Sequence, residues 1–355
     1  MAYTTINDPS AHFHAQLYTG NGSELAVTNN ANSGNFQPDW IWIKDRSAST
    51  DHFSHDTSRT ITKRLEPNGN AAERNNSQDL KSVQSNGFTV GNNAGCNSNT
   101  NLHVAWQWKA NGGTTATNTD GATNGYNTTV QANQTAGFSI VKWNAAFDQG
   151  NGRYNLGHGL GKMADFIAIK NMDASGDWYL HHKDIDDNDY LRWNLNNATS
   201  NTGARYTFYR PAFTTSIFNV DYNNIVTQNQ NYIAYVFATI KGYSHFGSYT
   251  GNGASDGPFI YTGFKPQYVW FKRLDVAENW YIYDSTRDPI NEIDRKLFID
   301  DGAAEGQSET LDFVSNGIKL QNSSSAFNTD GGTYIYAAFA KSPFVSSAGV
   351  PTTAR

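Results

Sequence analysis

Phe36-Gln-Pro-Asp-Trp-Ile-Trp-Ile-Lys44 returns later in the chain as Phe264-Lys-Pro-Gln-Tyr-Val-Trp-Phe-Lys272, and a worn copy, Ala164-Asp-Phe-Ile-Ala-Ile-Lys170, lies between them. Side chains alternate between two kinds along each copy, as they do along a β-strand with two unlike faces. Three related strands in one chain indicate an architecture that is repeated. The fold is therefore decided by a small β-rich unit used three times.

The two faces of these strands predict which side chains are buried. Ile41, Ile43, Val269 and Phe271 form the aliphatic-rich face, and we expect them to point into domain cores. The opposite face carries Trp40, Trp42, Tyr268 and Trp270 and ends in Lys44 or Lys272. We expect this second face to be partly exposed, with both lysines reaching solvent.

Further matches show that the repeat is a whole domain rather than a short motif. Leu17-Tyr-Thr-Gly-Asn-Gly22 matches Ser248-Tyr-Thr-Gly-Asn-Gly253, and Ala71-Ala-Glu73 matches Ala303-Ala-Glu305. Pro266 follows Pro38 by 228 residues, and Lys272 follows Lys170 by 102 residues. A constant register over such distances is typical of tandem domains.

The expected fold is all-β, with three tandem antiparallel β-sandwich domains of the jelly-roll, lectin-like type and under a tenth helix. Short alternating strands separated by Asn-Gly and Gly-Asn turns favour a sandwich. A propeller blade of about 45 residues is too short for this repeat. We place repeat 1 at residues 1–112, a low-complexity linker at 113–134, a divergent repeat 2 at 135–242, and repeat 3 with a C-terminal tail at 243–355.

Composition excludes several classes of function. The chain has 355 residues and a formal net charge of −6, which argues against binding to nucleic acid. The single cysteine, Cys96, cannot form an intrachain disulfide. Residues 1–6 resemble no secretion signal, and no apolar run is long enough to insert into a membrane. We expect a protein made and folded in a cytosol.

Outward aromatic rings are the best binding candidates, because aromatic faces stack on sugar rings. Trp42 and Trp270 hold equivalent positions, as do Trp178 and Trp280. More often such rings pack between sheets, domains or subunits, and we favour packing over ligand binding here.

An Asp-x-x-Arg pattern accompanies the strands in two of the repeats. Asp56 and Arg59 in repeat 1 match Asp284 and Arg287 in repeat 3, whereas repeat 2 has His182 at the Asp position and no matching Arg. Beside the tryptophans, these pairs could bind the hydroxyls or acid groups of a glycan. More often such a pair forms a salt bridge or caps a turn.

No motif indicates catalysis, a metal or a cofactor. The acidic run Asp184–Asp189 lacks the Gly and Glu of a calcium-binding EF-hand loop, which favours a surface turn. His12 and His14 share a strand face, but two ligands do not make a metal site. No nucleophile elbow, zinc-protease motif or phosphate loop occurs. We expect no enzyme, no metal and no cofactor.

Several segments resemble one family of proteins. They are residues 2–10, Leu17–Gly22, Gln37–Lys44, Gly242–Gly253 and the tail 343–355. Together they resemble the tandem-repeat, tail-fibre-like virion proteins of marine bacteriophages of the cyanophage type. The resemblance implies lectin-like modules of the concanavalin/laminin-G class, assembly in the host cytoplasm and a place in the virion. It supplies no catalytic residues.

The resemblance and the residues together predict a virion structural protein on the particle exterior. It would be a tail fibre or appendage, or a capsid decoration, that contributes to host attachment. The alternatives are a lectin for host-surface glycan and, less favoured, a polysaccharide depolymerase. Expected partners are other virion proteins and further copies of this chain, with a homotrimer favoured because external appendages of this kind are commonly trimeric.

Overall fold

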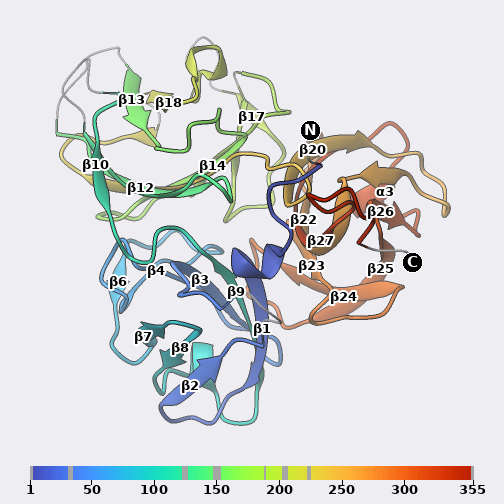
Figure 1. Ribbon diagram of the computed structural model, residues 1–355, viewed down its shortest axis with the longest axis horizontal. Helices are drawn as coiled ribbons and strands as arrows, with labels where there is room; N and C mark the ends of the chain where they lie inside the picture. The colour runs from blue at the N-terminus through green and yellow to red at the C-terminus, as the bar shows by residue number, and fades with distance from the viewer. Residues whose placement is uncertain are drawn as a thin grey trace.

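Antiparallel β-sheets make up most of the protein. The computed structural model describes residues 3–30, 35–121, 127–146, 153–187, 189–201, 207–221 and 225–352. Strands account for 46% of the chain and helices for 5%, which confirms the all-β prediction. Figure 1 shows three groups of strands arranged around a common centre. No helix of the described ranges is both long and apolar enough to cross a membrane.

Repeat 1 contains a four-stranded, a three-stranded and a two-stranded sheet. The four-stranded sheet has the order β1 (Phe13–Thr19), β9 (Leu102–Trp108), β3 (Trp40–Asp45) and β4 (Phe53–Asp56). The three-stranded sheet has the order β2 (Leu25–Thr28), β8 (Gly87–Val90) and β7 (Leu80–Gln84). β5 (Lys63–Arg64) pairs with β6 (Arg74–Asn75), and the short helices are η1 (Pro9–Ala11) and α1 (Ala94–Asn97).

Repeat 2 is built on an eight-stranded sheet. Its order is β10 (Ala116–Asn118), β11 (Thr128–Asn133), β12 (Phe138–Asn144), β19 (Asn231–Phe237), β14 (Phe166–Asn171), β15 (Tyr179–His182), β16 (Asp189–Arg192) and β17 (Ser200–Asn201). β13 (Arg153–Gly157) pairs with β18 (Ile217–Asp221), and η3 spans Arg210–Ala212.

The predicted linker at 113–134 is wrong in part, because β10 and β11 lie within it. Both strands join the sheet of repeat 2, where β11 pairs with β12. The segment lacks large apolar anchors, but its backbone is held by the strand ladder, and Gln131 is fully buried. Composition alone could not reveal a strand stabilised in this way. Residues 122–126 of the segment lie outside the described ranges.

Repeat 3 forms a second eight-stranded sheet. Its order is β20 (Ser244–Thr250), β27 (Thr333–Pro343), β22 (Phe264–Arg273), β23 (Tyr281–Asp284), β24 (Ile293–Phe298), β25 (Gly306–Val314), β26 (Gly317–Leu320) and β21 (Phe259–Tyr261). The short helix α3 spans Ser325–Asn328.

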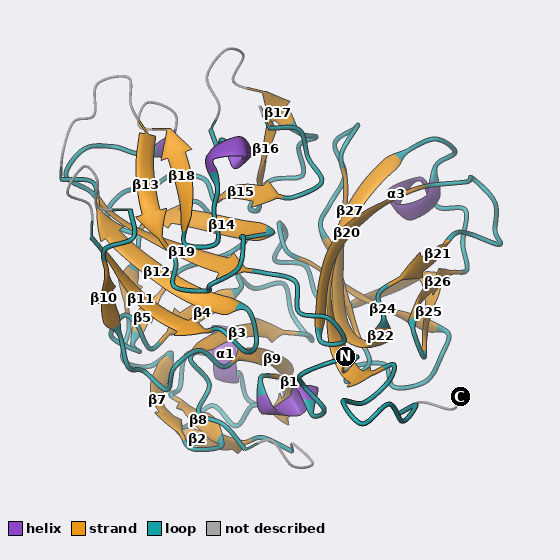
Figure 2. Ribbon diagram, turned by 45° about the horizontal axis from the view of Figure 1, so that its top comes forward, coloured by secondary structure: helices purple, strands orange, loops and turns teal. Residues whose placement is uncertain are grey.

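The three lysine-ended strands occupy equivalent places in their sheets, as the repeats predict. Each lies between the closing strand of its repeat and the strand that follows it, in the orders β1-β9-β3-β4, β12-β19-β14-β15 and β20-β27-β22-β23. The register agrees as well, since Trp40 pairs with Trp108, Phe166 with Phe237, and Tyr268 with Phe339. Figure 2 shows these blocks around the centre of the molecule.

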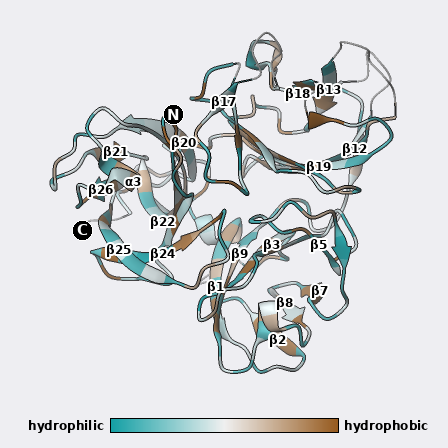
Figure 3. Cartoon of the chain, turned by 180° about the vertical axis from the view of Figure 1, so that it is seen from behind, coloured by the Kyte–Doolittle hydropathy of each residue, from teal (hydrophilic) through white to brown (hydrophobic). Residues whose placement is uncertain are grey.

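The aliphatic faces point into separate cores, as predicted. Ile41 and Ile43 pack in a core made only of repeat 1, and Val269 and Phe271 pack in a core made only of repeat 3. Ile167 and Ile169 do the same in repeat 2. In Figure 3, hydrophobic and hydrophilic residues are interspersed along the strands. Each repeat therefore has a core of its own.

The opposite faces meet one another instead of solvent. A fourth core contains Trp40, Trp42 and Trp106 from repeat 1, with Phe166, Tyr235 and Phe237 from repeat 2 and Tyr268, Trp270 and Phe339 from repeat 3. The prediction that this face is partly exposed is wrong, because each sheet covers the aromatic face of its neighbours. A single shared aromatic core joins all three repeats.

The shared Tyr-Thr-Gly-Asn-Gly motif closes a turn over a short helix. Asn97 in α1 accepts a hydrogen bond from the Asn21 amide at 2.9 Å, and Tyr18 donates to the Cys96 carbonyl at 2.6 Å. Asn328 in α3 binds the Asn252 amide in the same way at 2.7 Å. Gly22 has a φ of +68°, a conformation that glycine adopts without strain. The motif is a structural clamp.

Candidate functional site

The Asp-x-x-Arg pairs are buried salt bridges that also close a turn. Asp56 ends β4, and its Oδ1 accepts the backbone amides of Ser58 and Arg59 at 3.0 Å each. Its Oδ2 accepts Arg59 Nε at 2.6 Å. Asp284 and Arg287 repeat the arrangement after β23, with Arg287 Nε at 2.5 Å from Asp284 Oδ2. All four side chains are buried. A glycan therefore cannot reach these charges, contrary to the predicted binding role.

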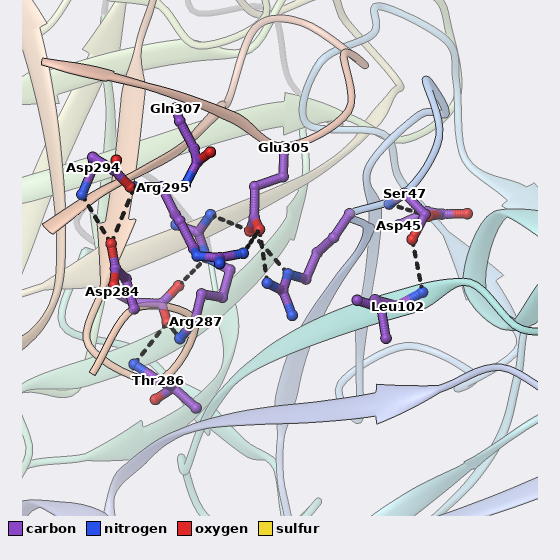
Figure 4. Close-up of polar contacts among 12 residues, drawn as sticks. Asp45, Ser47, Leu102, Asp284, Thr286, Arg287, Asp294, Arg295, Glu305 and Gln307 are labelled. Atoms are coloured by element: carbon purple, nitrogen blue, oxygen red, sulfur yellow. Dashed lines mark hydrogen bonds and ion pairs between the residues drawn. The ribbon is translucent and has the colours of Figure 1, made fainter. Parts of the chain in front are cut away.

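The glutamate of the Ala-Ala-Glu motif extends each pair. Arg59 Nη1 donates to Glu73 at 3.0 Å, and Arg287 Nη1 donates to Glu305 at 3.0 Å. Arg46 of repeat 1 reaches across to Glu305 of repeat 3 with two hydrogen bonds, of 2.8 and 2.7 Å. In Figure 4, Arg287 and Arg295 both point toward Glu305. In repeat 1 and in repeat 3, the Asp, the Arg and the Glu of the two motifs thus form one network.

Burial and ion pairing act in opposite directions on Glu305. Burial by itself raises its pKa, but the hydrogen bonds from Arg46 and the charge of Arg287 outweigh that effect and lower the pKa to about 2. Glu305 therefore stays ionised over the whole neutral range. This is the behaviour of a structural ion pair, not that of a proton donor poised near neutral pH.

Each residue at the Asp position also contacts the closing strand of a neighbouring repeat. The Tyr235 hydroxyl of repeat 2 donates to Asp56 Oδ2 at 2.8 Å, and Trp106 Nε1 of repeat 1 donates to Asp284 Oδ2 at 3.1 Å. In repeat 2, His182 Nε2 donates instead to the Tyr336 carbonyl of repeat 3 at 3.2 Å. The three contacts close a ring in which repeat 1 contacts repeat 3, repeat 3 contacts repeat 2, and repeat 2 contacts repeat 1.

The two exceptional residues of this ring, His182 and Ala337, lie at the same interface, where His182 contacts the residue before Ala337. Ala337 of repeat 3 holds the position of Trp106 and Tyr235 but has no side-chain donor. The interface beside it is with repeat 2, where His182 replaces the aspartate. Burial lowers the pKa of His182 to about 3, so the imidazole is neutral there. Both losses are visible in the sequence, and they fall at the same one of the three interfaces.

Backbone hydrogen bonds repeat at all three interfaces with the same spacing. The residue six positions after each strand lysine donates to the neighbouring repeat, and the residue two positions after the lysine accepts from it. The first set is Thr50 to Gly302, Gly176 to Asn70, and Glu278 to Asn196, each at 2.8 Å. The second set is Glu305 to Arg46 at 2.9 Å, Glu73 to Met172 at 2.9 Å, and Thr199 to Leu274 at 3.0 Å. The three interfaces between repeats therefore share one pattern of backbone hydrogen bonds.

The prediction that Lys44 and Lys272 reach solvent is wrong. Their side chains are buried at these interfaces, with exposures of 0% and 1%. Lys272 Nζ donates to the Asn196 carbonyl of repeat 2 at 2.9 Å, and Lys170 Nζ donates to the Asn70 carbonyl of repeat 1 at 3.1 Å. Burial lowers the pKa of Lys44, Lys170 and Lys272 to about 8 in each case. Lys170 and Lys272 thus join loops of neighbouring repeats, whereas Lys44 Nζ donates to the Asp45 and Ala48 carbonyls of its own repeat.

The outward position predicted for Trp42 and Trp270 is also wrong. Trp42 is 0% exposed and Trp270 is 3% exposed. Trp42 donates from Nε1 to His52 Nδ1 at 2.8 Å, while Trp270 packs against Trp280 with ring centroids 5.3 Å apart. The void between the central rings has a volume of about 10 Å³, which leaves room for no sugar. Packing between repeats, the alternative use of these rings, is what the structure shows.

Trp178 and Trp280 are also interface residues. Trp178 Nε1 donates to the Glu66 carbonyl of repeat 1 at 2.9 Å, and Trp280 Nε1 donates to the Arg192 carbonyl of repeat 2 at 3.1 Å. Both rings are fully buried. A polar atom on a large ring is satisfied here by the backbone of the adjacent repeat.

The other polar candidates are held by the protein itself. His14 contacts Gln16, with His14 Nε2 3.2 Å from Gln16 Oε1, and His12 packs against the Tyr243 ring. In the acidic turn, Asp184 pairs with Lys183 at 2.7 Å, while Asn188 lies outside the described residues. Cys96 is buried, which raises the pKa of its thiol to about 12. Within the described ranges, no three His, Cys, Asp or Glu side chains come together as a metal site would require.

A match to a known protein family covers most of the chain. Residues 8–343 match the family described as "Domain of unknown function (DUF7483)". The chain belongs to this family. The match runs from the residue before η1 to the last residue of β27, so the DUF7483 domain comprises all three repeats. No curated protein and no solved structure matches the chain.

Two exposed aromatic residues of the DUF7483 domain were missed by the sequence analysis. Phe259 and Tyr261 on β21 are 48% and 54% exposed. The Tyr261 hydroxyl lies 3.2 Å from that of Tyr3, which donates to the Gly263 carbonyl at 2.8 Å. Neither ring belongs to a repeated motif, so no recurring pattern in the sequence points to them.

Proposed function

We propose that this chain is a structural protein of a bacteriophage particle, assembled in the host cytoplasm and displayed on the particle exterior. It would serve as a tail fibre or appendage, or as a capsid decoration, and would help the particle attach to its host. The observation that carries the proposal is the use of the repeated charged and aromatic residues to join the three repeats. Asp56, Arg59, Asp284 and Arg287 are all held in buried contacts. The role requires no catalytic site.

The finer fold belongs to the same proposal. Each repeat would be a lectin-like β-sandwich of the jelly-roll type, and three of them would form one body. The separate aliphatic cores of the three repeats support this, since an independent core is the mark of a domain. The shared aromatic core supports a fixed arrangement of the three repeats.

The homotrimer stays part of the proposal, but its interface needs another surface. The aromatic faces considered for subunit contact are already covered within one chain. The approximate threefold arrangement of one chain would itself suit a position on a threefold axis of the particle. Other virion proteins would then be its direct partners.

The decisive experiment is to locate the chain in intact particles. Antibodies against the folded chain should bind to purified particles and label either the tail or the head in electron micrographs. Absence of the chain from purified particles, by mass spectrometry and labelling together, would refute the proposal. Particles that lack the chain should still assemble but adsorb to cells more slowly.

A glycan-binding role remains a second candidate, now at a different place. Phe259 and Tyr261 are exposed, and the Tyr261 hydroxyl contacts that of Tyr3, which lines a cleft of about 700 Å³ together with Gln134, Lys162 and Lys241. Exposed rings beside amide and ammonium groups suit an acidic sugar. The chain should bind glycans on an array, and Tyr261→Ala should abolish that binding. Release of reducing ends from host envelope would instead indicate a depolymerase.

A further inference from the structure

The three equivalent opening strands differ in what lies beside their outer edges. In repeat 2, β12 pairs on that side with β11. In repeats 1 and 3, β1 and β20 are the end strands of their sheets, with no further strand among the described residues. Figure 2 shows β10, β11 and β12 side by side, whereas β1 ends its sheet. An unpaired edge presents free backbone donors and acceptors.

β11 occupies a groove between repeat 2 and the turn that follows β4 of repeat 1. Gln131 of β11 lies opposite Ile140 of β12, and its side chain is fully buried. Its Nε2 donates to Ser58 Oγ at 2.8 Å and to Thr57 Oγ1 at 3.1 Å. The side-chain amide of Gln131 thus joins repeat 2 to repeat 1.

Among the residues that the structure describes, nothing fills the corresponding groove beside β1. It is a cavity of about 220 Å³ lined by residues that include Ala15, Gln16, Leu17, Gln267 and Thr286. Ala15 pairs with Trp106 as Ile140 pairs with Tyr235, so Ala15 is the counterpart of Ile140. Thr286 follows Asp284 by two positions, as Ser58 follows Asp56. The cavity therefore lies at the place that β11 fills in repeat 2.

The backbone of β1 is oriented to receive a strand. Hydrogen bonds from Gly20 to Asn101 and from Lys109 to His12 identify the pairs bonded to β9, and every second residue between them faces β9. The amide and carbonyl groups of Ala15 and Leu17 consequently face the open edge. Their counterparts in repeat 2, Ile140 and Lys142, face β11.

The side chain of Gln16 partly covers this edge. Gln16 Nε2 donates to the Leu17 carbonyl at 2.7 Å, which is one of the acceptors that a guest strand would use. The counterpart of Gln16 in β12 is Val141, which has no such donor. Gln16 thus competes with any added strand for the Leu17 carbonyl.

We propose that the groove beside β1 binds an extended segment of a partner polypeptide, which adds to β1 as β11 adds to β12. The segment is uncharged and carries an amide side chain at the residue opposite Ala15, where Gln267 and Thr286 supply polar partners. Main-chain hydrogen bonds provide the affinity and this one side chain provides the specificity. The inference goes beyond the proposed virion role and does not depend on it.

A peptide that copies β11 tests the inference on the full chain. The probe is a synthetic peptide with the sequence of residues 127–134, titrated into the isotopically labelled protein at up to millimolar concentration. We expect saturable changes in the backbone amide signals of Ala15 and Leu17, with slower hydrogen exchange at both. Gln16→Val should tighten binding about tenfold, because the competing side-chain bond is lost.

Methylated peptides provide the matched controls. N-methylation at the positions of Thr129 and Gln131, whose amides face β12 in the chain, should abolish binding. N-methylation at Val130 and Ala132 should leave binding intact. The proposal is overturned if the peptide changes the Ala15 and Leu17 signals in neither the parent protein nor Gln16→Val. It is also overturned if the peptide methylated at Thr129 and Gln131 binds as well as the one methylated at Val130 and Ala132. The same signals changing with protein concentration alone would assign the groove to a second copy.

Discussion

Trp106 of repeat 1 donates its indole N–H to the carboxylate of Asp284 in repeat 3, at 3.1 Å and away from solvent. Asp284 also accepts Arg287, so one carboxylate closes a turn, neutralises a buried cation and binds a neighbouring repeat. Tyr235 and Asp56 repeat this relationship between repeats 2 and 1. The aspartates that were predicted to bind a ligand therefore connect neighbouring repeats.

Removing the charge of Asp284 should strongly destabilise the protein. Asp284→Asn leaves Arg287 buried without its nearest counterion, and we expect a loss of about 3–5 kcal/mol in the free energy of unfolding. Asp275→Asn is the control, because Asp275 is 40% exposed and should contribute less than about 1 kcal/mol. Chemical denaturation of both variants tests this. Equal midpoints would contradict the structural role of Asp284.

The hydrogen bond from Tyr235 to Asp56 should be measurable by itself. Tyr235→Phe removes only the hydroxyl, and we expect a cost of about 1.5–3 kcal/mol because the acceptor is charged. Tyr268→Phe is the matched control, since the buried Tyr268 hydroxyl has no hydrogen-bond partner among the described residues. That variant should be neutral or more stable. Thermal melts of the pair decide between these outcomes.

Acid should weaken the repeat 1 to repeat 3 interface through Glu305. Its pKa is about 2 in the folded protein and near 4.5 when unfolded. A lowered folded pKa stabilises the protein above pH 4.5, and this contribution, about 3 kcal/mol, is lost as the pH falls toward 2. Glu305→Gln should flatten the stability curve between these values, whereas Glu24→Gln at the surface should not. Denaturation at several pH values provides the measurement.

Alkaline pH should first stabilise the protein. Lys44, Lys170 and Lys272 have pKa values of about 8 in the folded protein and near 10.5 when unfolded, so the unfolded chain holds more protons between these values. Stability then rises with pH, by at most about 1.4 kcal/mol per pH unit for each lysine. Above about pH 10 the trend should reverse, because burial raises the pKa of Tyr243 and the unfolded chain loses that proton first.

A lysine replacement separates this effect from others. Lys272→Met should reduce the slope of stability against pH between 8 and 10, whatever its effect on stability at neutral pH. Lys81→Met is the control, because Lys81 is a surface residue paired with the exposed Glu24. An unchanged slope in Lys272→Met would show that this lysine does not titrate in that range.

Replacing the central tryptophans should cost stability. Trp42→Ala and Trp270→Ala each open a cavity in the shared core, and we expect losses of about 3–5 kcal/mol. Tyr261→Ala removes an exposed ring and should leave the melting temperature nearly unchanged. If glycan binding exists, Tyr261→Ala should lose it. Stable tryptophan variants would mean that the shared core does not hold the repeats together.

The sequence by itself determined the strand content, the threefold repetition and the inner aliphatic faces. Alternation along Trp40–Lys44 separates Ile41 and Ile43 from the tryptophans because successive side chains of a strand point to opposite sides. The common register of the repeats also placed the lysine-ended strands at equivalent positions. These properties depend on neighbours along the chain, which a single sequence displays.

Only the tertiary structure decided what the second face contacts. The same alternation fits a face in water and a face against another sheet, so Trp42, Trp270, Lys44 and Lys272 were assigned to the wrong environment. Closing the three repeats into a ring places each aromatic face against the others, and it places Lys170 and Lys272 against a loop of the neighbouring repeat. It also turns Asp56 and Asp284 toward donors 179 and 178 residues away in the chain. Such partners are set by packing between repeats, and no local pattern encodes them.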